Sequence, residues 1–286
     1  MDAIIQAIIQ GVLLGGLYAA LGLGMSMIFG IVKITNLAHG DFLILPCYLS
    51  LVFMGILKTS PLITLIVVVP AMFFVGFGIQ RSMLNRVIGR GDEPPLLLTF
   101  GLSIIIQNLL LYIFTANAQK LKTPLLLKSI AATETIFIPV MYLIACLVGA
   151  GVIVALGLYM KKTYMGRAIR ATSDDVEAAT LMGVNIKSTF GVAMGISMMT
   201  AAVAGVMLGI LFNFYPSSGP GYLITAFAVV IIGGIGSIYG TLAAGLIFGL
   251  AQALGGYFVG AEFQILVGYV VLLVMLIVRP QGLFSR

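Results

Sequence analysis

Eight apolar runs, one of them interrupted, set the limits on what this chain can fold into. Most of them approach the length of about 20 residues that a helix needs to cross the hydrocarbon core of a bilayer. The runs cover residues 4–29, 42–57, 61–79, 96–116, 136–160, 188–212, 223–254 and 263–278. Only 8% of the residues are charged, against about 25% in soluble domains. The sequence therefore predicts an all-α integral membrane protein that forms one transmembrane domain over residues 1–286.

The basic residues indicate which loops face the cytoplasm. The formal net charge is +6, but these residues are scattered through short loops, so membrane topology explains them better than nucleic-acid binding. With the N-terminus outside, and with run 223–254 entering and leaving at one face, eleven of the 15 Lys and Arg are cytoplasmic. They are Lys33, Arg81, Arg86, Arg90, Lys161, Lys162, Arg167, Arg170, Lys187, Arg279 and Arg286. This arrangement predicts about eight crossings, with the interrupted run forming a re-entrant pair or two short crossings.

Two glycine-containing segments, one in each half of the chain, interrupt helices at membrane depth. Such breaks are tolerated only where protein or water surrounds them, and their free N–H groups can face a solute. We therefore predict that residues 33–41 and 233–240 line a translocation pathway. The alternatives are a tight cytoplasmic turn for the first segment and a packing patch for the second. The candidate pathway residues are Asn36, His39, Gly40, Asp41, Gly233, Gly234, Gly236 and Ser237.

A polar stripe runs along the fourth apolar run. Thr99, Ser103 and Gln107 are spaced four residues apart, so they lie on one face of a helix. They either line the same passage or form hydrogen bonds to a neighbouring membrane helix. We include all three among the candidate pathway residues.

Few residues here could carry catalysis. His39 is the only histidine and has Asp41 nearby, whereas zinc usually needs three or four ligands, so we predict no metal site. No serine is placed as a nucleophile for a hydrolytic triad. Cys47 and Cys146 lie inside apolar runs, which does not suggest a disulfide. The chain also lacks the G-x-x-x-x-G-K-[ST] motif of P-loop ATPases, so any ATP-driven transport needs ATPase partners.

The polar interval 161–187 contains the densest charge of the chain. Asp174 followed by Glu177 forms a capping-box pattern, and Gly183 is a typical residue to end a helix. This pattern predicts one short cytoplasmic helix, which is either a docking protrusion or a plain surface loop.

Several motifs resemble one family of transport proteins. Glu177, Ala178 and Ala179, followed after three residues by Gly183, resemble the EAA loop of ABC-importer permeases, a cytoplasmic helix that rests in a cleft of the ATPase subunit. Residues 24–41, 227–240 and 279–284 are similar to branched-chain amino acid permeases of the LivH type. These matches occur in the same order as in that family and span most of the chain.

The resemblance implies a permease subunit of a binding-protein-dependent ABC importer in the bacterial plasma (inner) membrane. The chain would form half of the pathway for branched-chain or other small amino acids, beside a second, similar permease. It would bind no cofactor itself. ATP and Mg would be held by two ABC ATPase subunits, and a solute-binding protein would deliver solute from outside. Coupling to the ATPase would involve Asp174, Glu177, Ala178, Ala179 and Gly183.

Three alternatives stay open at this point. Similar permeases also carry urea, short amides or other small polar solutes, so the solute is not fixed by the motifs. A secondary carrier driven by an ion gradient could act alone, without ATPase partners. A membrane-embedded enzyme would use His39 and Asp41.

Overall fold

The computed structural model describes residues 2–131 and 135–284, and helices dominate it. The α-helices are α1 (Asp2–Ile31), α2 (His39–Leu57), α3 (Pro61–Ser82), α4 (Glu93–Phe114), α5 (Val140–Lys162), α6 (Tyr164–Asp174), α7 (Val176–Leu181), α8 (Ile186–Leu211), α9 (Gly219–Gly233), α10 (Ile238–Phe258) and α11 (Gln264–Val278). Short 3-10 helices are η1 (Leu84–Arg86), η2 (Pro124–Leu127), η3 (Pro216–Ser218) and η4 (Ala261–Phe263). The strands β1 (Ser129–Ala131) and β2 (Phe137–Pro139) pair antiparallel, with Ile130 opposite Ile138.

The helices confirm the predicted all-α membrane fold. Within the described ranges, nine helical segments are long and apolar enough to cross a bilayer. The count is one above the prediction of about eight, because run 223–254 forms two helices, α9 and α10, on either side of a turn. Two helices joined by a turn are what both arrangements expected for this run require.

Helix α1 is the central helix of the bundle. Most of its residues are buried, and it packs most extensively against α10, with further contacts to α5, α8 and α9. Two glycines allow this contact, because a Cβ on Gly11 would lie 2.9 Å from the Leu250 Cα and one on Gly15 2.7 Å from the Leu246 Cα. Small residues let helix backbones approach closely in lipid, where tight packing holds helices together.

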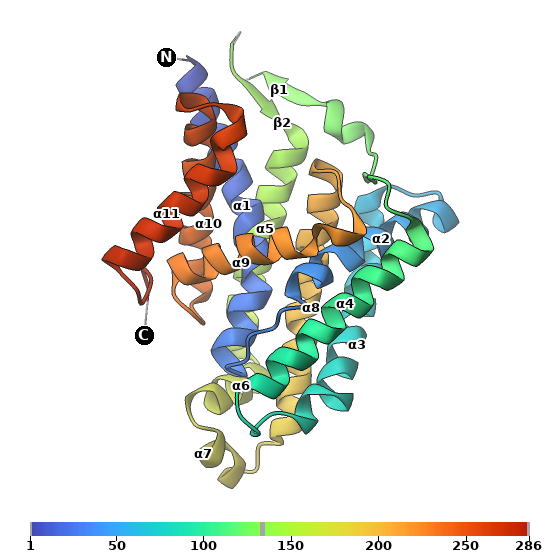
Figure 1. The fold of residues 1–286 in the computed structure, drawn as a ribbon, viewed down its shortest axis with the longest axis vertical. Coiled ribbons are helices and arrows are strands. Elements are labelled where there is room, and N and C mark those ends of the chain that lie inside the picture. The colour runs from blue at the N-terminus through green and yellow to red at the C-terminus, as the bar shows by residue number, and fades with distance from the viewer. Residues whose placement is uncertain (1, 132–134, 285–286) are drawn as a thin grey trace.

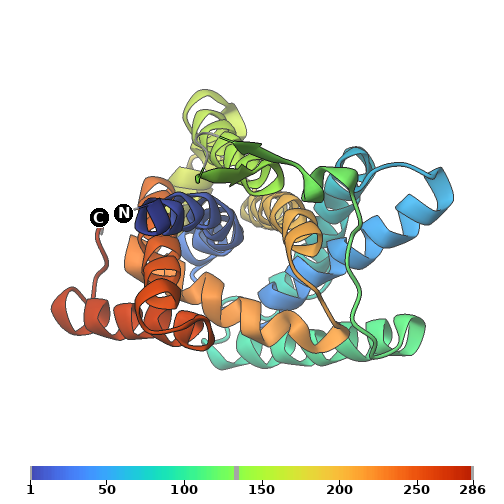
Figure 2. The same ribbon diagram turned by 90° about the horizontal axis from the view of Figure 1, so that it is seen from above.

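The helices differ in their inclination. Figure 1 and Figure 2 show that α1, α5 and α8 run along the long axis of the molecule, whereas α2, α4 and α9 are strongly inclined to it. Helix α9 lies across the bundle at mid-height, between the two ends of α1. It contacts α1, α2, α10 and α11.

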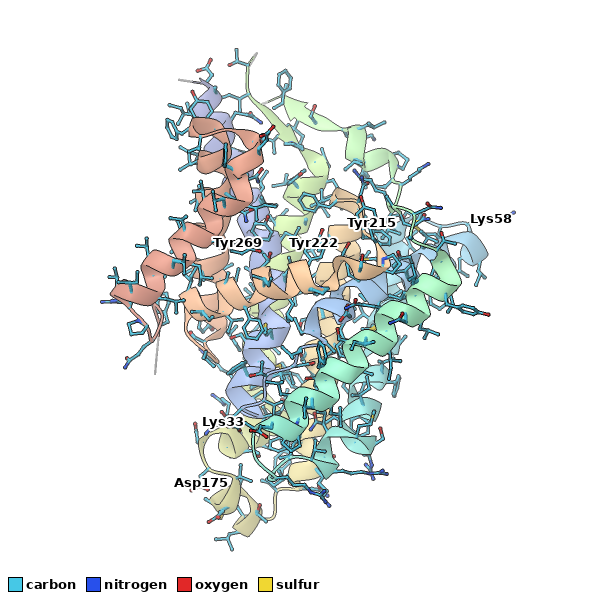
Figure 3. All side chains as sticks on the ribbon, in the orientation of Figure 1. Lys33, Lys58, Asp175, Tyr215, Tyr222 and Tyr269 are labelled. Carbon is cyan, nitrogen blue, oxygen red and sulfur yellow. The ribbon has the colours of Figure 1, made fainter. Side chains whose placement is uncertain are left out.

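The two ends of the bundle carry different elements. At one end, here called the outer end, the Gln6 side chain donates to the Phe137 carbonyl (2.7 Å) and accepts from its N–H (3.1 Å), which ties α1 to β2. At the other end, the α7 end, the Asn85 side chain donates to the Lys187 carbonyl at 3.2 Å. Figure 3 shows Lys33 and Asp175 at the α7 end and Lys58 far from it. Lys33 and Lys187 thus lie at the α7 end, and the cytoplasmic orientation of this end stays a prediction; Arg286 lies outside the described residues.

Candidate functional site

Residues 161–187 form two helices where the sequence predicted one. Helix α6 is strongly amphipathic and packs on α1, α5 and α8 with Gly166, Ile169 and Thr172 buried. The Ser173 hydroxyl donates to the Gly30 carbonyl at 2.6 Å, so the end of α6 is attached to the end of α1. Helix α7 follows directly and makes fewer contacts with the bundle.

The cap of α7 is Asp175, and the prediction of Asp174 was wrong. Asp175 accepts from the N–H groups of Glu177 (2.8 Å) and Ala178 (3.0 Å). Asp174 is the last residue of α6, whereas Asp175 has the extended backbone (φ −151°, ψ 114°) that an N-cap needs. The expected return bond from Glu177 to the Asp174 N–H is not formed, because Asp174 lies inside α6, and Ala178 rather than Glu177 is the third residue after the Asp175 cap.

The far end of α7 carries an exposed apolar tip. Gly183 has φ +83° and ends the helix as predicted, with the Val184 N–H bonded to the Ala179 carbonyl at 3.0 Å. Ala179 is buried, whereas Glu177 and Ala178 are exposed. Leu181 and Met182 are 88% and 84% exposed. Helix α7 is therefore a capped projection with two apolar side chains at its tip.

A second group of candidates meets where α2 begins. We call Asn36, Asp41, Thr99, Ser103 and Gln107 the inner polar cluster. Ser103 donates to the Asp41 Oδ2 at 2.5 Å, and Gln107 donates to the Ser103 hydroxyl at 3.1 Å. The Thr99 hydroxyl accepts from the Leu37 N–H at 3.2 Å. The polar stripe of α4 thus bonds to segment 33–41, as one of its two predicted roles required.

Asp41 occupies an unusual position in this cluster. It lies in the first turn of α2, is 1% exposed, and its Oδ1 has no hydrogen-bond partner among the described residues. A Cβ on Gly219, the first residue of α9, would collide with this Oδ1, and one on Gly40 would collide with the Gly219 carbonyl. The carboxylate therefore sits between the N-termini of two helices, whose dipoles favour a negative charge. The Asn36 Nδ2 is likewise buried and unbonded in the part of the chain described.

His39 does not pair with Asp41. Its Nε2 lies 3.3 Å from the Leu21 carbonyl, and the imidazole is buried between α1 and α2. No hydrogen bond joins the two side chains in the described ranges, so the histidine–carboxylate pair needed by the enzyme alternative is not assembled. Nor do residues 2–131 and 135–284 hold a group of three or more His, Cys, Asp or Glu that could bind a metal ion.

The second glycine segment forms the turn between α9 and α10 at the α7 end. Gly234 and Gly236 have φ of +95° and +79°, and Ser237 caps α10 by accepting from the Gly240 N–H at 3.0 Å. A Cβ on Gly30 would lie 2.5 Å from the Gly236 Cα. The tail covers Gly233, because Leu283 and Phe284 donate to the Ile232 and Gly233 carbonyls at 2.9 and 3.2 Å. These contacts match the packing alternative, and a pathway role for this turn stays a prediction.

The structure also reveals polar groups that the sequence did not single out. At the outer end, α1, α5, α10 and α11 enclose a cavity of about 420 Å³. Beneath it the Tyr18 hydroxyl donates to the Gln252 Oε1 at 2.6 Å, and the Tyr269 and Thr225 hydroxyls lie 3.5 Å apart. The one signal available was Gln252 itself, the sole amide in α10, since polar residues inside membrane helices are costly and usually functional.

Known proteins of similar sequence are transport permeases. The chain is 29% identical to the high-affinity branched-chain amino acid transport system permease protein BraD of Pseudomonas aeruginosa, over 99% of this chain and 96% of the relative. It is 30% identical to the LivH permease proteins of Escherichia coli K12 and Salmonella typhimurium, again over 99% and 96%. No solved structure matches this fold at a significant level.

The match to a family model covers nearly the whole chain. Residues 7–279 fit the model described as branched-chain amino acid transport system / permease component. That range includes the inner polar cluster, α7 and the turn between α9 and α10. The chain therefore belongs to the family of permease components of branched-chain amino acid transport systems.

Proposed function

We propose that this chain is a permease subunit of a binding-protein-dependent ABC importer and forms half of a pathway for branched-chain or other small amino acids. The observation that carries the proposal is α7, a capped helix with an exposed apolar tip at the end where Lys33 and Lys187 lie. The names of BraD and LivH support the solute class, since both are described as branched-chain amino acid permeases.

Energy would reach this chain from partners. Because the sequence has no P-loop, ATP and Mg would be bound by two ATPase subunits, one of which holds α7. A second, similar permease would complete the pathway, and a binding protein would deliver solute at the outer end. The plasma membrane of a bacterial cell is the location that fits this assembly.

The contacts of α6 suggest how motion of α7 reaches the pathway. Helix α6 joins α7 without a linker and bonds to Gly30 through Ser173. Gly30 in turn touches Gly236 in the turn between α9 and α10. Helix α9 extends from this turn to Gly219, which lies against Asp41. Movement of the docking helix would therefore be passed through α6 and α9 to the inner polar cluster, where solute would cross.

Replacing the apolar tip of α7 tests this function. The double variant Leu181→Glu, Met182→Glu should insert normally but lose most ATPase co-purification and ATP-driven uptake, because charge replaces the apolar contact. Leu127→Glu is the matched control, since Leu127 is 90% exposed at the opposite end of the bundle. Unchanged co-purification and uptake in the double variant would contradict the proposal. So would ion-driven uptake by the chain alone, which would establish a secondary carrier.

A further inference from the structure

The cavity at the outer end has the size and shape of a small-molecule site. Its volume of about 420 Å³ lies within the range of about 300–1,000 Å³ typical of ligand pockets. One stripe of α1, with Gln6 and Gln10 among its members, faces Tyr142 of α5 and Gln264 of α11 across it. The lining comes from α1, β2, α5, α10, η4 and α11 together with Phe212, so the cavity belongs to the assembled fold.

The lining is largely apolar, with a few polar groups and no charged side chain. Its polar groups are the amides of Gln6, Gln10 and Gln264 and the phenols of Tyr142 and Tyr257, and no Lys, Arg, His, Asp or Glu lines it. The Gln6 amide is used in its two bonds to Phe137. The Gln10 and Gln264 amides make no hydrogen bond within residues 2–131 and 135–284, so they are available to a ligand. A site of this kind accepts a neutral or zwitterionic molecule and disfavours one with net charge.

A buried hydrogen bond closes the inner side of the cavity. Tyr18 lies one helical turn below Leu14, and Gln252 precedes Ala253; both Leu14 and Ala253 line the cavity. The Tyr18–Gln252 bond of 2.6 Å joins α1 to α10, and both side chains are buried. A Cβ on Gly268 would lie 2.9 Å from the Gln252 side chain, so α11 packs closely over this bond.

Beyond this bond, further hydroxyl groups continue toward α9. The Tyr18 ring packs against Phe248, with ring centroids 5.5 Å apart, and Phe248 packs against Tyr269, with centroids 6.1 Å apart. Figure 3 shows Tyr222 and Tyr269 at the level where α9 crosses the bundle, below the end that holds the cavity. The Tyr269 hydroxyl faces Thr225 of α9. Uncharged polar groups therefore extend from the cavity to the helix whose first residue touches Asp41.

We propose that the outer cavity holds one small neutral or zwitterionic solute molecule before it crosses, and that the Tyr18–Gln252 hydrogen bond is the barrier on its inner side. Gln10 and Gln264 supply hydrogen bonds to the solute. Breaking the Tyr18–Gln252 bond opens the way to α9. This inference rests on the proposed transport function, which it extends by naming a site and the charge class of its ligand.

Solute protection of an introduced cysteine tests the site directly. In the complete transporter reconstituted in vesicles, Gln10→Cys is labelled with a maleimide in the presence of leucine, glutamate or lysine. Leucine should slow labelling, while glutamate and lysine should protect at least about tenfold less well, because the cavity offers no countercharge. Lys122→Cys, at the same end but outside the cavity, is the matched control, and the parent chain gives the background from Cys47 and Cys146.

The barrier has its own readout. Tyr18→Phe keeps the ring contact with Phe248 but removes the hydroxyl. It should raise passive leucine leak without ATP by about threefold to tenfold, the factor that one buried hydrogen bond contributes. Solute protection at Gln10→Cys should persist in this variant. An unchanged leak would overturn the barrier.

The outcomes separate this inference from the proposed function. If the parent complex transports leucine with ATP but leucine does not protect Gln10→Cys, the holding site is wrong and the proposed function stands. If leucine protects but no ATP-driven uptake occurs, the proposed function fails and the site stands. Labelling that responds to removal of lipid and not to solute would assign the cavity to a lipid chain and overturn the proposal.

Discussion

The two glycine segments look alike in sequence, yet the structure uses them differently. In residues 33–41, Gly40 brings the start of α2 against Gly219 and leaves a buried carboxylate between two helix N-termini. In residues 233–240, the glycines pack against backbone at Gly30 and under the chain tail. A glycine in a membrane helix shows that something approaches the backbone closely. If that neighbour is a polar side chain, the segment is a candidate site. If it is another backbone, the segment is a packing contact between helices.

The largest effect is expected at Gly40, where one substitution tests the tight contact on which the difference between the two segments depends. Gly40→Ala should destabilise the fold by about 3 kcal/mol, the upper range for overpacking, because its Cβ would collide with the Gly219 carbonyl. Thermal unfolding in detergent measures this. Gly55→Ala in the same helix has nothing within 4 Å of its Cβ and should change stability by less than about 0.5 kcal/mol. Equal effects at the two positions would refute the tight contact between α2 and α9.

The next effect is a loss of uptake in a variant that keeps its stability. Asp41→Asn keeps an acceptor for Ser103 and removes a buried charge, so stability should hold or rise. Uptake should fall by about tenfold, or about 1.4 kcal/mol of coupling, because the polar group facing α9 has lost its charge. Asp175→Asn is the control, since Asn caps helices as well as Asp does. If the Asp41→Asn variant takes up solute at the normal rate, residues 33–41 also serve only as a packing contact between helices.

The smallest effect is expected in the second segment. Gly236→Ala places a Cβ 3.1 Å from the Gly30 Cα at φ +79°, which should cost about 1 kcal/mol. Gly236→Asn should recover part of this loss, because Asn tolerates left-handed backbone. Uptake divided by the amount of folded protein should fall far less than the roughly tenfold expected for Asp41→Asn, because the turn transmits motion but does not line the pathway. A fall as large as that of Asp41→Asn would give the turn the pathway role that the sequence suggested.

The fold was largely readable from the sequence because bilayer thickness fixes the length of each crossing. The end of α7 at Gly183 was readable for a similar reason, since a left-handed residue closes a helix locally. The sequence did not show whether Asp174 or Asp175 caps α7. Both can cap a helix, and α6 extends to Asp174 beside the long-range bond from Ser173 to Gly30.

The candidate site was readable only in part. The spacing of Thr99, Ser103 and Gln107 exposed the polar stripe, but its partner Asp41 lies on another helix. Tyr18 and Gln252 are 234 positions apart, so no local pattern links them. Leu181 and Met182 were visible in the sequence as apolar residues of a short capped helix, but their exposure was not, because exposure depends on what the rest of the bundle covers. Contacts between distant segments therefore account for most of what the sequence left undetermined.

The close contact of α1 with α10 at Gly11 and Gly15 has a consequence for how the protein is made. Helix α1 leaves the ribosome well before α10, its most extensive neighbour. During translation, α1 must therefore wait in lipid with the backbone around Gly11 and Gly15 uncovered. Nascent chains that stop before α10 would keep this backbone surface of α1 uncovered.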